Sequence, residues 1–189
     1  MQMEMPTPAG KNFIRRATFA EIDGILAVQR AAPECAQWTR ADYEEVLTTS
    51  AILTAPEPQG FSPRHVVLCA LQGDTVVGFA VGSRLRFAET VDCELENMAV
   101  LPTHRRCGVG RDMVQALLVW SREQGGPQRA MQLMLEARAS NTAALELYHK
   151  MGFLPVGRRR EYYSQPTDDA ILMAWFPAAK QPQSGEPHF

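Results

Sequence analysis

The part of this sequence that most constrains its fold is a glycine-containing loop that joins a strand-like segment to a helix-like one. Residues 90–100, TVDCELENMAV, alternate as a strand does, and residues 104–113, HRRCGVGRDM, lead into apolar residues at helical spacing. Gly108 and Gly110 let the backbone turn tightly, so that several N–H groups and the positive end of the helix converge on one point. The loop is therefore predicted to bind an anionic group.

Arginines at three positions strengthen this prediction. Arg105, Arg106 and Arg111 place positive charge around the loop, which suits a diphosphate. Two familiar motifs are excluded. The loop lacks the Gly-Lys-Ser/Thr ending of a P-loop, and Met113 stands where the dinucleotide-binding fingerprint needs its third glycine. The sequence therefore indicates phosphate binding by a different motif.

The segments around this loop predict a mixed α/β protein. Strand-like segments occupy residues 12–18, 65–71, 75–85, 90–100, 130–137, 156–164 and 170–176, and helix-like segments occupy residues 18–30, 39–47, 113–120 and 141–151. Antiparallel hairpins come first and crossovers follow in the middle of the chain. This order is typical of an α/β (α+β) fold, with a mixed, mostly antiparallel central sheet of about seven strands flanked by about four helices.

One domain is expected. A chain of 189 residues is long enough for one well-filled core, and residues 11–176 are predicted to form it. Residues 1–10 and 177–189 contain proline and glycine and are expected to be flexible ends. Residues 54–63, with three prolines and a glycine, are expected to form a loop.

Composition narrows the function and the location. The net charge of −2 does not favour a nucleic-acid binder, which needs a clearly basic surface. The first residues lack the pattern of a signal peptide, and no apolar stretch approaches the roughly 20 residues of a membrane helix. The four cysteines form no CxxC pair and have no histidine at zinc spacing. No metal site is expected, and the protein is predicted to be reduced and cytoplasmic.

A second informative stretch is LMLEARASNTAALELYHKMGF, residues 133–153. Its pattern predicts a strand that ends near Glu136, a helix capped by Asn141, and Tyr148 on that helix. Spacing alone favours two ordinary interpretations, a solvent-facing carboxylate at Glu136 and a core aromatic at Tyr148. The sequence around these residues shifts the interpretation of both towards catalysis.

Several motifs together carry a resemblance to a known family. ENMAV-x5-RCGVGR, then LEARASN, LELYHKMGF, RRREYY and DDAILMA closely resemble the GNAT acyltransferases, and within them the RimI-type ribosomal-protein-alanine N-acetyltransferases. The resemblance covers residues 88–175, nearly half of the chain, and the remainder fits more loosely. It implies the GNAT fold and acetyl-CoA as the co-substrate, without a metal.

The resemblance also implies where acetyl-CoA binds. The backbone of residues 98–100 would pair with the pantetheine arm like an added strand, and the loop would hold the pyrophosphate. Asn141 would contact the cofactor in addition to capping its helix. The implied cofactor-binding residues are Met98, Ala99, Val100, Arg105, Arg106, Cys107, Gly108, Val109, Gly110, Arg111 and Asn141.

Acetyl transfer to an amine requires a neutral amine, a stabilised oxyanion and a proton for the departing thiolate. By the resemblance, Glu136 is the proton acceptor and Tyr148 the proton donor. An α-amino group has a pKa of about 7.7 to 8.0, compared with about 10.4 for lysine, so a carboxylate in a partly apolar cleft is a sufficient base.

A strand of acidic residues offers a rival base. Strict alternation would place one set of side chains on one face of the strand and a second set on the other. The first set is Asp92, Glu94 and Glu96, and the second is Cys93, Leu95 and Asn97. The ordinary interpretation of the acidic set is a solvated face. Glu94 or Glu96 is the alternative base, or attracts the cationic amine.

Acceptor-binding residues are also implied by the resemblance. Tyr162 and Tyr163 would border the peptide site, although an aromatic pair on an edge strand is an equally good interpretation. Trp38 lies between the first two helices, in a region that the family uses for substrate. The expected Phe-Pro before Trp38 is absent, and residues 54–63 are an extra loop.

The sequence thus predicts an acetyl-CoA-dependent N-acetyltransferase that works by direct transfer in a ternary complex. The predicted acceptor is the α-amine of a protein N-terminus, alanine-like, for example on a ribosomal protein. One alternative is a small-molecule amine or a lysine side chain, and another is a non-catalytic CoA-binding sensor. Neither nucleic acid nor membrane is an expected partner, and the oligomeric state is left open.

Overall fold

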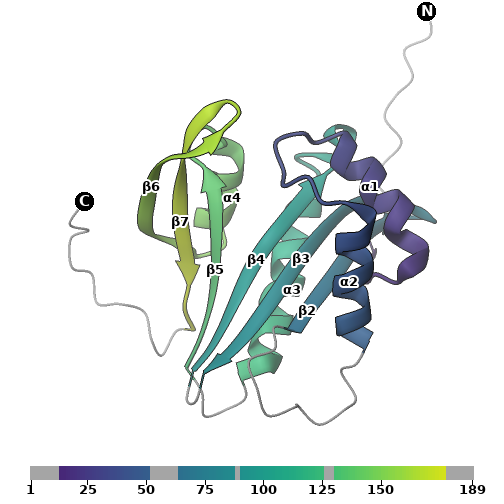
Figure 1. Ribbon diagram of the computed structural model, residues 1–189, viewed down its shortest axis with the longest axis horizontal. Coiled ribbons are helices and arrows are strands. Elements are labelled where there is room, and N and C mark those ends of the chain that lie inside the picture. The colour runs from purple at the N-terminus through teal and green to yellow at the C-terminus, as the bar shows by residue number, and fades with distance from the viewer. Residues whose placement is uncertain (1–12, 52–63, 88–89, 126–129, 178–189) are drawn as a thin grey trace, which may run out of the picture.

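The computed structural model describes residues 13–51, 64–87, 90–125 and 130–177 (Figure 1). The loop predicted at residues 54–63 and nearly all of the predicted flexible ends lie outside these ranges. The strands are β1 (Phe13–Arg16), β2 (Arg64–Gln72), β3 (Thr75–Phe87), β4 (Thr90–Val100), β5 (Ala130–Arg138), β6 (Leu154–Ser164) and β7 (Thr167–Trp175). The helices are α1 (Ile22–Arg30), α2 (Arg40–Ala51), α3 (Val109–Gly125) and α4 (Thr142–Lys150), with short 3-10 turns at Phe19–Glu21 and Pro102–His104.

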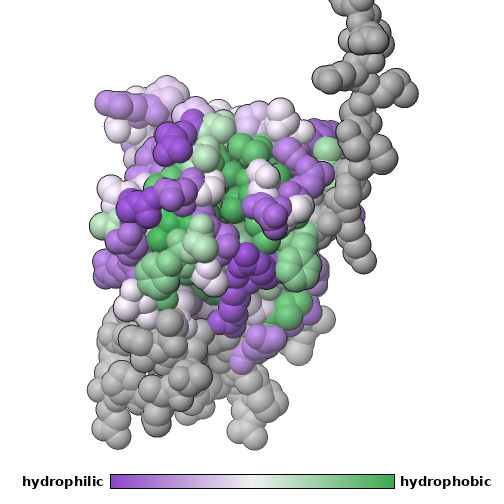
Figure 2. Space-filling view, turned by 90° about the vertical axis from the view of Figure 1, so that its right-hand side faces the viewer, coloured by the Kyte–Doolittle hydropathy of each residue, from purple (hydrophilic) through white to green (hydrophobic). Residues whose placement is uncertain are grey.

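All seven strands form one sheet in the order β1-β2-β3-β4-β5-β7-β6. Only the β4–β5 pair is parallel among these neighbours. The predicted mixed, mostly antiparallel sheet with four helices is therefore confirmed. One buried cluster lies on each face of the sheet. Helices α1 and α2 pack on one face, and α3 and α4 pack on the other. The surface seen from the side of α1 and α2 mixes polar residues with apolar patches (Figure 2).

The sheet opens in its middle. The last residue pair between β4 and β5 is Leu95 with Leu135, although β4 continues to Val100 and β5 to Arg138. The two strands separate visibly beyond this pair (Figure 1). On its other side β4 stays paired with β3 as far as Val100. The end of β4 therefore has one paired edge and one edge that faces an opening.

A β-bulge changes the direction of side chains along β4. Asn97 pairs with Val81 and Leu95 pairs with Gly82, so Glu96 is an extra residue between two neighbouring partners on β3. An extra residue reverses the alternation beyond it, because side chains on a strand repeat every two residues. The bulge therefore separates two stretches of β4 with opposite phase.

The strict alternation expected for β4 is consequently wrong. Cys93 and Leu95 belong to the core under α3, as expected. Asn97 does not share their face, since its side chain contacts Ala36 and Tyr43 on the α1–α2 side. Past the bulge it is Met98 that packs against the α3 core.

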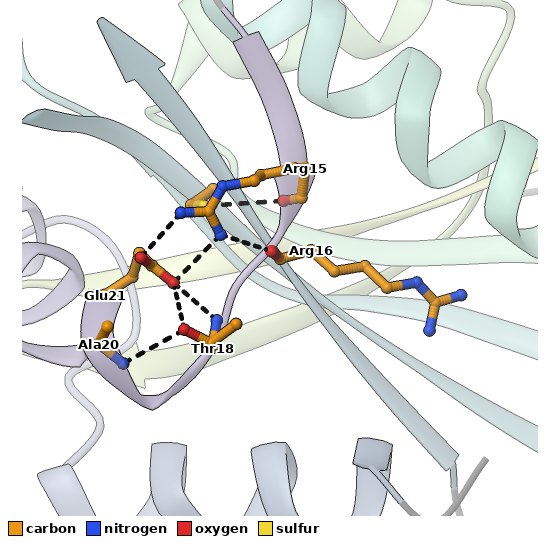
Figure 3. A network of polar contacts seen from close by, with 6 residues as sticks. Arg15, Arg16, Thr18, Ala20 and Glu21 are labelled. Atoms are coloured by element: carbon orange, nitrogen blue, oxygen red, sulfur yellow. Dashed lines mark hydrogen bonds and ion pairs between the residues drawn. The ribbon is translucent and has the colours of Figure 1, made fainter. Parts of the chain in front are cut away.

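The chain enters α1 through a fixed turn at Thr18, as the sequence predicts. The Thr18 hydroxyl accepts from the Ala20 N–H, and the Glu21 carboxylate accepts from the Thr18 N–H at 2.7 Å (Figure 3). Arg15 adds an ion pair to Glu21 at 2.8 Å. Its guanidinium, together with the Thr18 donors, lowers the pKa of Glu21 to about 2 against the opposing effect of desolvation.

No helix in the described ranges is both long and apolar enough to cross a membrane. Among the same residues, no group of three or more His, Cys, Asp and Glu side chains could hold a metal ion. The four cysteines are free thiols, of which Cys69 and Cys93 are buried and Cys107 is exposed.

Candidate active site

A cleft of about 620 Å³ lies where β4 and β5 separate. Its described walls come from the end of β4, the loop before α3, the end of β5, α4, Tyr163 and the segment after α1. Both Glu136 and Tyr148 line it. The structure thus brings the two predicted catalytic residues to one cavity from different elements.

Glu136 sits just past the last β4–β5 pair. Its neighbours Leu135 and Ala137 are buried in the α3 core, so alternation turns the Glu136 side chain to the opposite face. The side chain is 22% exposed, and its Oε1 lies 3.0 Å from Nη1 of Arg159 on β6. Glu136 is therefore a half-buried carboxylate held by one cation, rather than a free surface charge.

The rival carboxylates share the α1–α2 side of the sheet with Glu136. Glu96 lines the cleft, and its Oε1 lies 3.7 Å from Nε2 of His65. Glu94 keeps contact with solvent, yet desolvation, and then the negative charges of Glu96 and Glu136, raise the pKa of its carboxyl. Three carboxylates close together favour a cation between them. This side of the cleft therefore suits a protonated amine.

Tyr148 is almost enclosed. Its side chain is 7% exposed, and its ring packs on Phe153 with centroids 5.7 Å apart. Burial, and secondarily the nearby Tyr163 phenol, raise the pKa of the Tyr148 phenol, so it keeps its proton at neutral pH. The same ring packs in the core and lines the cleft, so its position is compatible with both the core interpretation and the catalytic one.

The loop before α3 has the backbone that its glycines predict. Arg106 and Gly108 have φ of 62° and 87°, in the left-handed region, and α3 begins at Val109. The loop thereby turns back on itself at the start of the helix, where unpaired N–H groups and the helix dipole favour an anion.

Most of the implied cofactor residues line the cleft, but two do not. Those in its lining are Met98, Ala99, Val100, Arg105, Arg106, Gly108, Gly110, Arg111 and Asn141. Cys107 instead turns its exposed thiol to the Arg105 carbonyl, and the Val109 side chain is buried in the α3 core. For Val109 only the backbone is left for a ligand. Asn141 also caps α4, since its Oδ1 accepts from the Ala144 N–H at 3.2 Å.

These features together fit acetyl-CoA. The free edge of β4 can pair with an amide-containing arm, and the loop with its arginines can hold a pyrophosphate. A Cβ at Gly110 would lie 3.2 Å from Leu147, so the glycine allows the start of α3 to pack closely against α4.

The aromatic residues predicted on the acceptor side differ in their positions. Tyr163 is half-buried and lines the cleft, with the Arg138 guanidinium 4.1 Å from its ring centroid. Tyr162 is 50% exposed and meets Tyr163 edge to face at 5.2 Å. Trp38 packs on Tyr43 at 5.5 Å and is not among the described lining residues, whereas residues 33–36 just before it are.

Four residues at or beside the cleft were given no functional role from sequence. Arg159 holds Glu136, His65 approaches Glu96, and Glu34 pairs with Arg105 across the cleft. Asn97 reaches the loop after α1. Each acts through a partner far away in sequence, so no local pattern distinguishes it from an ordinary surface or strand residue.

Comparison with known proteins gives consistent results. A family model described as Acetyltransferase (GNAT) family matches residues 28–153. The chain is 38% identical over 144 residues to the N-alpha-acetyltransferase RimI of Mycobacterium tuberculosis, covering 71% of this chain and 87% of that protein. It is 33% identical over 118 residues to the [Ribosomal protein bS18]-alanine N-acetyltransferase of Haemophilus influenzae, with coverages of 60% and 73%.

Solved structures share the fold. The crystal structure of the ribosomal-protein-S18-alanine N-acetyltransferase from Escherichia coli superimposes with a TM-score of 0.65 at 24% identity, covering 94% of this chain and 99% of that one. Arabidopsis thaliana NAA60 in complex with acetyl-CoA gives a TM-score of 0.69 at 17% identity, with coverages of 88% and 98%.

Proposed function

This chain belongs to the GNAT acetyltransferase family and is an acetyl-CoA-dependent N-acetyltransferase, and we propose that its acceptor is the α-amine of a protein N-terminus. Relatives named for N-alpha-acetylation and for acetylation of a ribosomal-protein alanine support an alanine-like first residue on a ribosomal protein. Such an acceptor would place the enzyme in the cytoplasm.

One observation carries the catalytic part of the proposal. Glu136 and Tyr148 line the same cleft, at the point where β4 leaves β5 and offers a free backbone edge. The thioester of acetyl-CoA would lie along that edge, with its pyrophosphate in the loop at Arg106 and Gly108. The amine would enter from the carboxylate side. Both catalytic groups would then face the reacting carbonyl.

The proposed reaction is a direct transfer. Glu136 accepts a proton from the α-ammonium group, directly or through one water, and the neutral amine attacks the thioester carbonyl carbon. The tetrahedral intermediate loses the second proton of its nitrogen to solvent and collapses, the carbon–sulfur bond breaks, and Tyr148 donates its proton to the departing sulfur. A protonated Glu136 and an ionised Tyr148 then return to their starting states by proton exchange with solvent.

Peptides with a free or a blocked α-amine test the acceptor. CoA release is measured with short peptides that differ in their first residue, each with and without an acetyl cap, and with a capped peptide that contains lysine. Turnover is expected only with a free α-amine, and fastest with small first residues. Turnover that survives capping contradicts the α-amine proposal. Acetyl-CoA binding without turnover on any amine would support a sensor instead.

A further inference from the structure

Residues 33–38, here called the acceptor wall, connect α1 to α2 without regular secondary structure. Four of them, residues 33–36, line the cleft. They lie on the α1–α2 side of the sheet, which also carries Glu94 and Glu96. The conformation of this segment therefore sets how much room an incoming acceptor has beside the carboxylates.

A buried glutamine holds one end of the acceptor wall. Gln29 on α1 is 4% exposed, and its side chain makes two hydrogen bonds to the backbone of Trp38. Its Nε2 donates to the Trp38 carbonyl at 2.8 Å, and its Oε1 accepts from the Trp38 N–H at 3.0 Å. The same Oε1 accepts from the Tyr43 hydroxyl at 2.7 Å. The buried amide is thus satisfied by one particular placement of the wall.

A buried asparagine holds the part of the wall that faces the cleft. Asn97 is 4% exposed, and its Nδ2 donates to the Ala36 carbonyl at 2.9 Å, with a longer contact of 3.5 Å to the Tyr43 hydroxyl. Asn97 reaches this side only because the bulge at Glu96 reverses the alternation of β4. One hydrogen bond therefore joins the acceptor wall to the strand that runs into the cofactor edge at Met98.

The oxygen of the Asn97 amide bears on how much this residue contributes to folding. Its Oδ1 is buried and finds no hydrogen-bond partner among the described residues. Burial of a carbonyl oxygen without a partner costs free energy of folding. Ala36 is exposed, so water could satisfy its carbonyl if Asn97 were absent. The amide therefore adds little to folding, and its remaining effect is to fix the wall.

We propose that Gln29 and Asn97 are positioning residues that hold the acceptor wall in a preformed shape, so that an acceptor binds without first ordering this segment. The inference rests on the proposed α-amine acceptor. A preordered wall lowers the entropic cost of binding, which appears as a lower KM for the acceptor. Neither residue takes part in proton transfer, so the rate at saturating acceptor depends little on them.

The main test is Asn97→Ala, assayed with an α-amine peptide that the wild-type enzyme acetylates. The KM for the peptide should rise about 3- to 10-fold, the range for loss of one hydrogen bond, while kcat and the Kd of acetyl-CoA stay within about twofold. The melting temperature should stay level or rise, because the orphaned Oδ1 is removed. Hydrogen exchange of the backbone amides in residues 34–38 should become faster.

Two further variants separate positioning from general damage. Gln29→Glu keeps the acceptor for the Trp38 N–H but loses the donor to its carbonyl, and should raise the peptide KM in the same direction as Asn97→Ala. Gln115→Ala is the control, since Gln115 is exposed on α3 and is not among the described residues that line the cleft. It should leave the KM unchanged.

The outcomes are distinct. Unchanged peptide KM and unchanged exchange in Asn97→Ala and Gln29→Glu would overturn the inference, as would a parallel rise in the Kd of acetyl-CoA. If the wild-type enzyme acetylates no free α-amine, the proposed acceptor is wrong. In that case the exchange rates of the backbone amides in residues 34–38 still decide whether Gln29 and Asn97 fix the wall.

Discussion

The two sides of the cleft are built in different ways. Apart from Asn141, the cofactor side comes from one continuous stretch, residues 98–111, and offers mainly backbone: a free strand edge and a loop with left-handed residues at a helix start. The acceptor side is assembled from the segment after α1, from β4 and β5, and from Tyr163 of β6. Its contacts are side-chain pairs such as Glu136 with Arg159 and Asn97 with Ala36.

This difference has a consequence for how each side responds to mutation. A binding site made of backbone groups changes when the chain conformation changes. A single strained residue should therefore weaken the binding of the whole cofactor. A site made of separate side chains should lose one contact at a time.

The largest effect is expected at the proposed base. Glu136→Gln should lower kcat/KM by about 100- to 10,000-fold, the usual contribution of general base catalysis. The Kd of acetyl-CoA, measured by calorimetry, should stay the same because the cofactor side is untouched. Glu96→Gln, the rival carboxylate, should cost about tenfold or less. If Glu96→Gln abolishes turnover and Glu136→Gln does not, the base is assigned to the wrong residue.

The second effect concerns stability rather than either side of the cleft. The Glu21 carboxyl fixes the turn that leads into α1, the helix that carries Gln29, and its pKa is lowered from 4.5 to about 2, chiefly by Arg15. A lowered pKa in the folded state means that the stabilisation is present above pH 4.5 and is lost as the pH falls towards 2. Glu21→Gln should therefore cost about 2–3 kcal/mol at pH 7, and the difference should vanish near pH 2.

Urea unfolding of both proteins between pH 7 and pH 2 measures this prediction. At pH 7, and at urea concentrations too low to unfold either protein, Glu21→Gln should bind acetyl-CoA as the wild type does. A stability difference that does not depend on pH would assign the loss to packing instead of charge.

A moderate effect is expected from strain in the cofactor loop. Gly108 has φ of 87°, and an added Cβ would meet nothing closer than 3.7 Å, so Gly108→Ala changes the backbone preference alone. We expect a loss of about 1 kcal/mol in stability and an increase of about 5- to 10-fold in the Kd of acetyl-CoA. The peptide KM at saturating acetyl-CoA should not change.

Gly73 provides the matched control for that variant. It lies in the β2–β3 turn with φ of 59° and open space around its Cβ position. Gly73→Ala should cost similar stability and leave both binding constants unchanged. Equal losses of acetyl-CoA affinity in both variants would mean that the loop acts only through global stability.

The same contrast explains what the sequence predicts well. The bounds of β4 were predicted without error at residues 90–100, and the left-handed Gly108 follows from a glycine at a strand-to-helix turn, because both signals are local. The bulge at Glu96 was not predicted, since it depends on the count of β4 residues against those of β3. Sequence alone also cannot select Arg159 from three consecutive arginines, because its ion pair with Glu136 depends on the register of β6 across β7.

The smallest effect tests whether the two sides are independent. The Arg105 guanidinium of the cofactor loop forms an ion pair with Glu34 of the acceptor wall, and the two side chains are 43% and 40% exposed. An exposed pair of this kind contributes little to stability, but Glu34 competes with a pyrophosphate for the same guanidinium. Glu34→Ala should therefore tighten acetyl-CoA binding about twofold, and this gain should disappear when Arg105→Ala is added.

Glu146 distinguishes a specific exchange of partners from a general loss of negative charge. Its carboxylate also lines the cleft, but it pairs with Lys150 at 3.6 Å. If Glu146→Ala tightens acetyl-CoA binding as much as Glu34→Ala does, the effect comes from the overall electrostatic potential of the cleft. If only Glu34→Ala does so, cofactor binding releases the acceptor wall from Arg105. The cofactor side and the acceptor side then communicate through the Arg105–Glu34 ion pair.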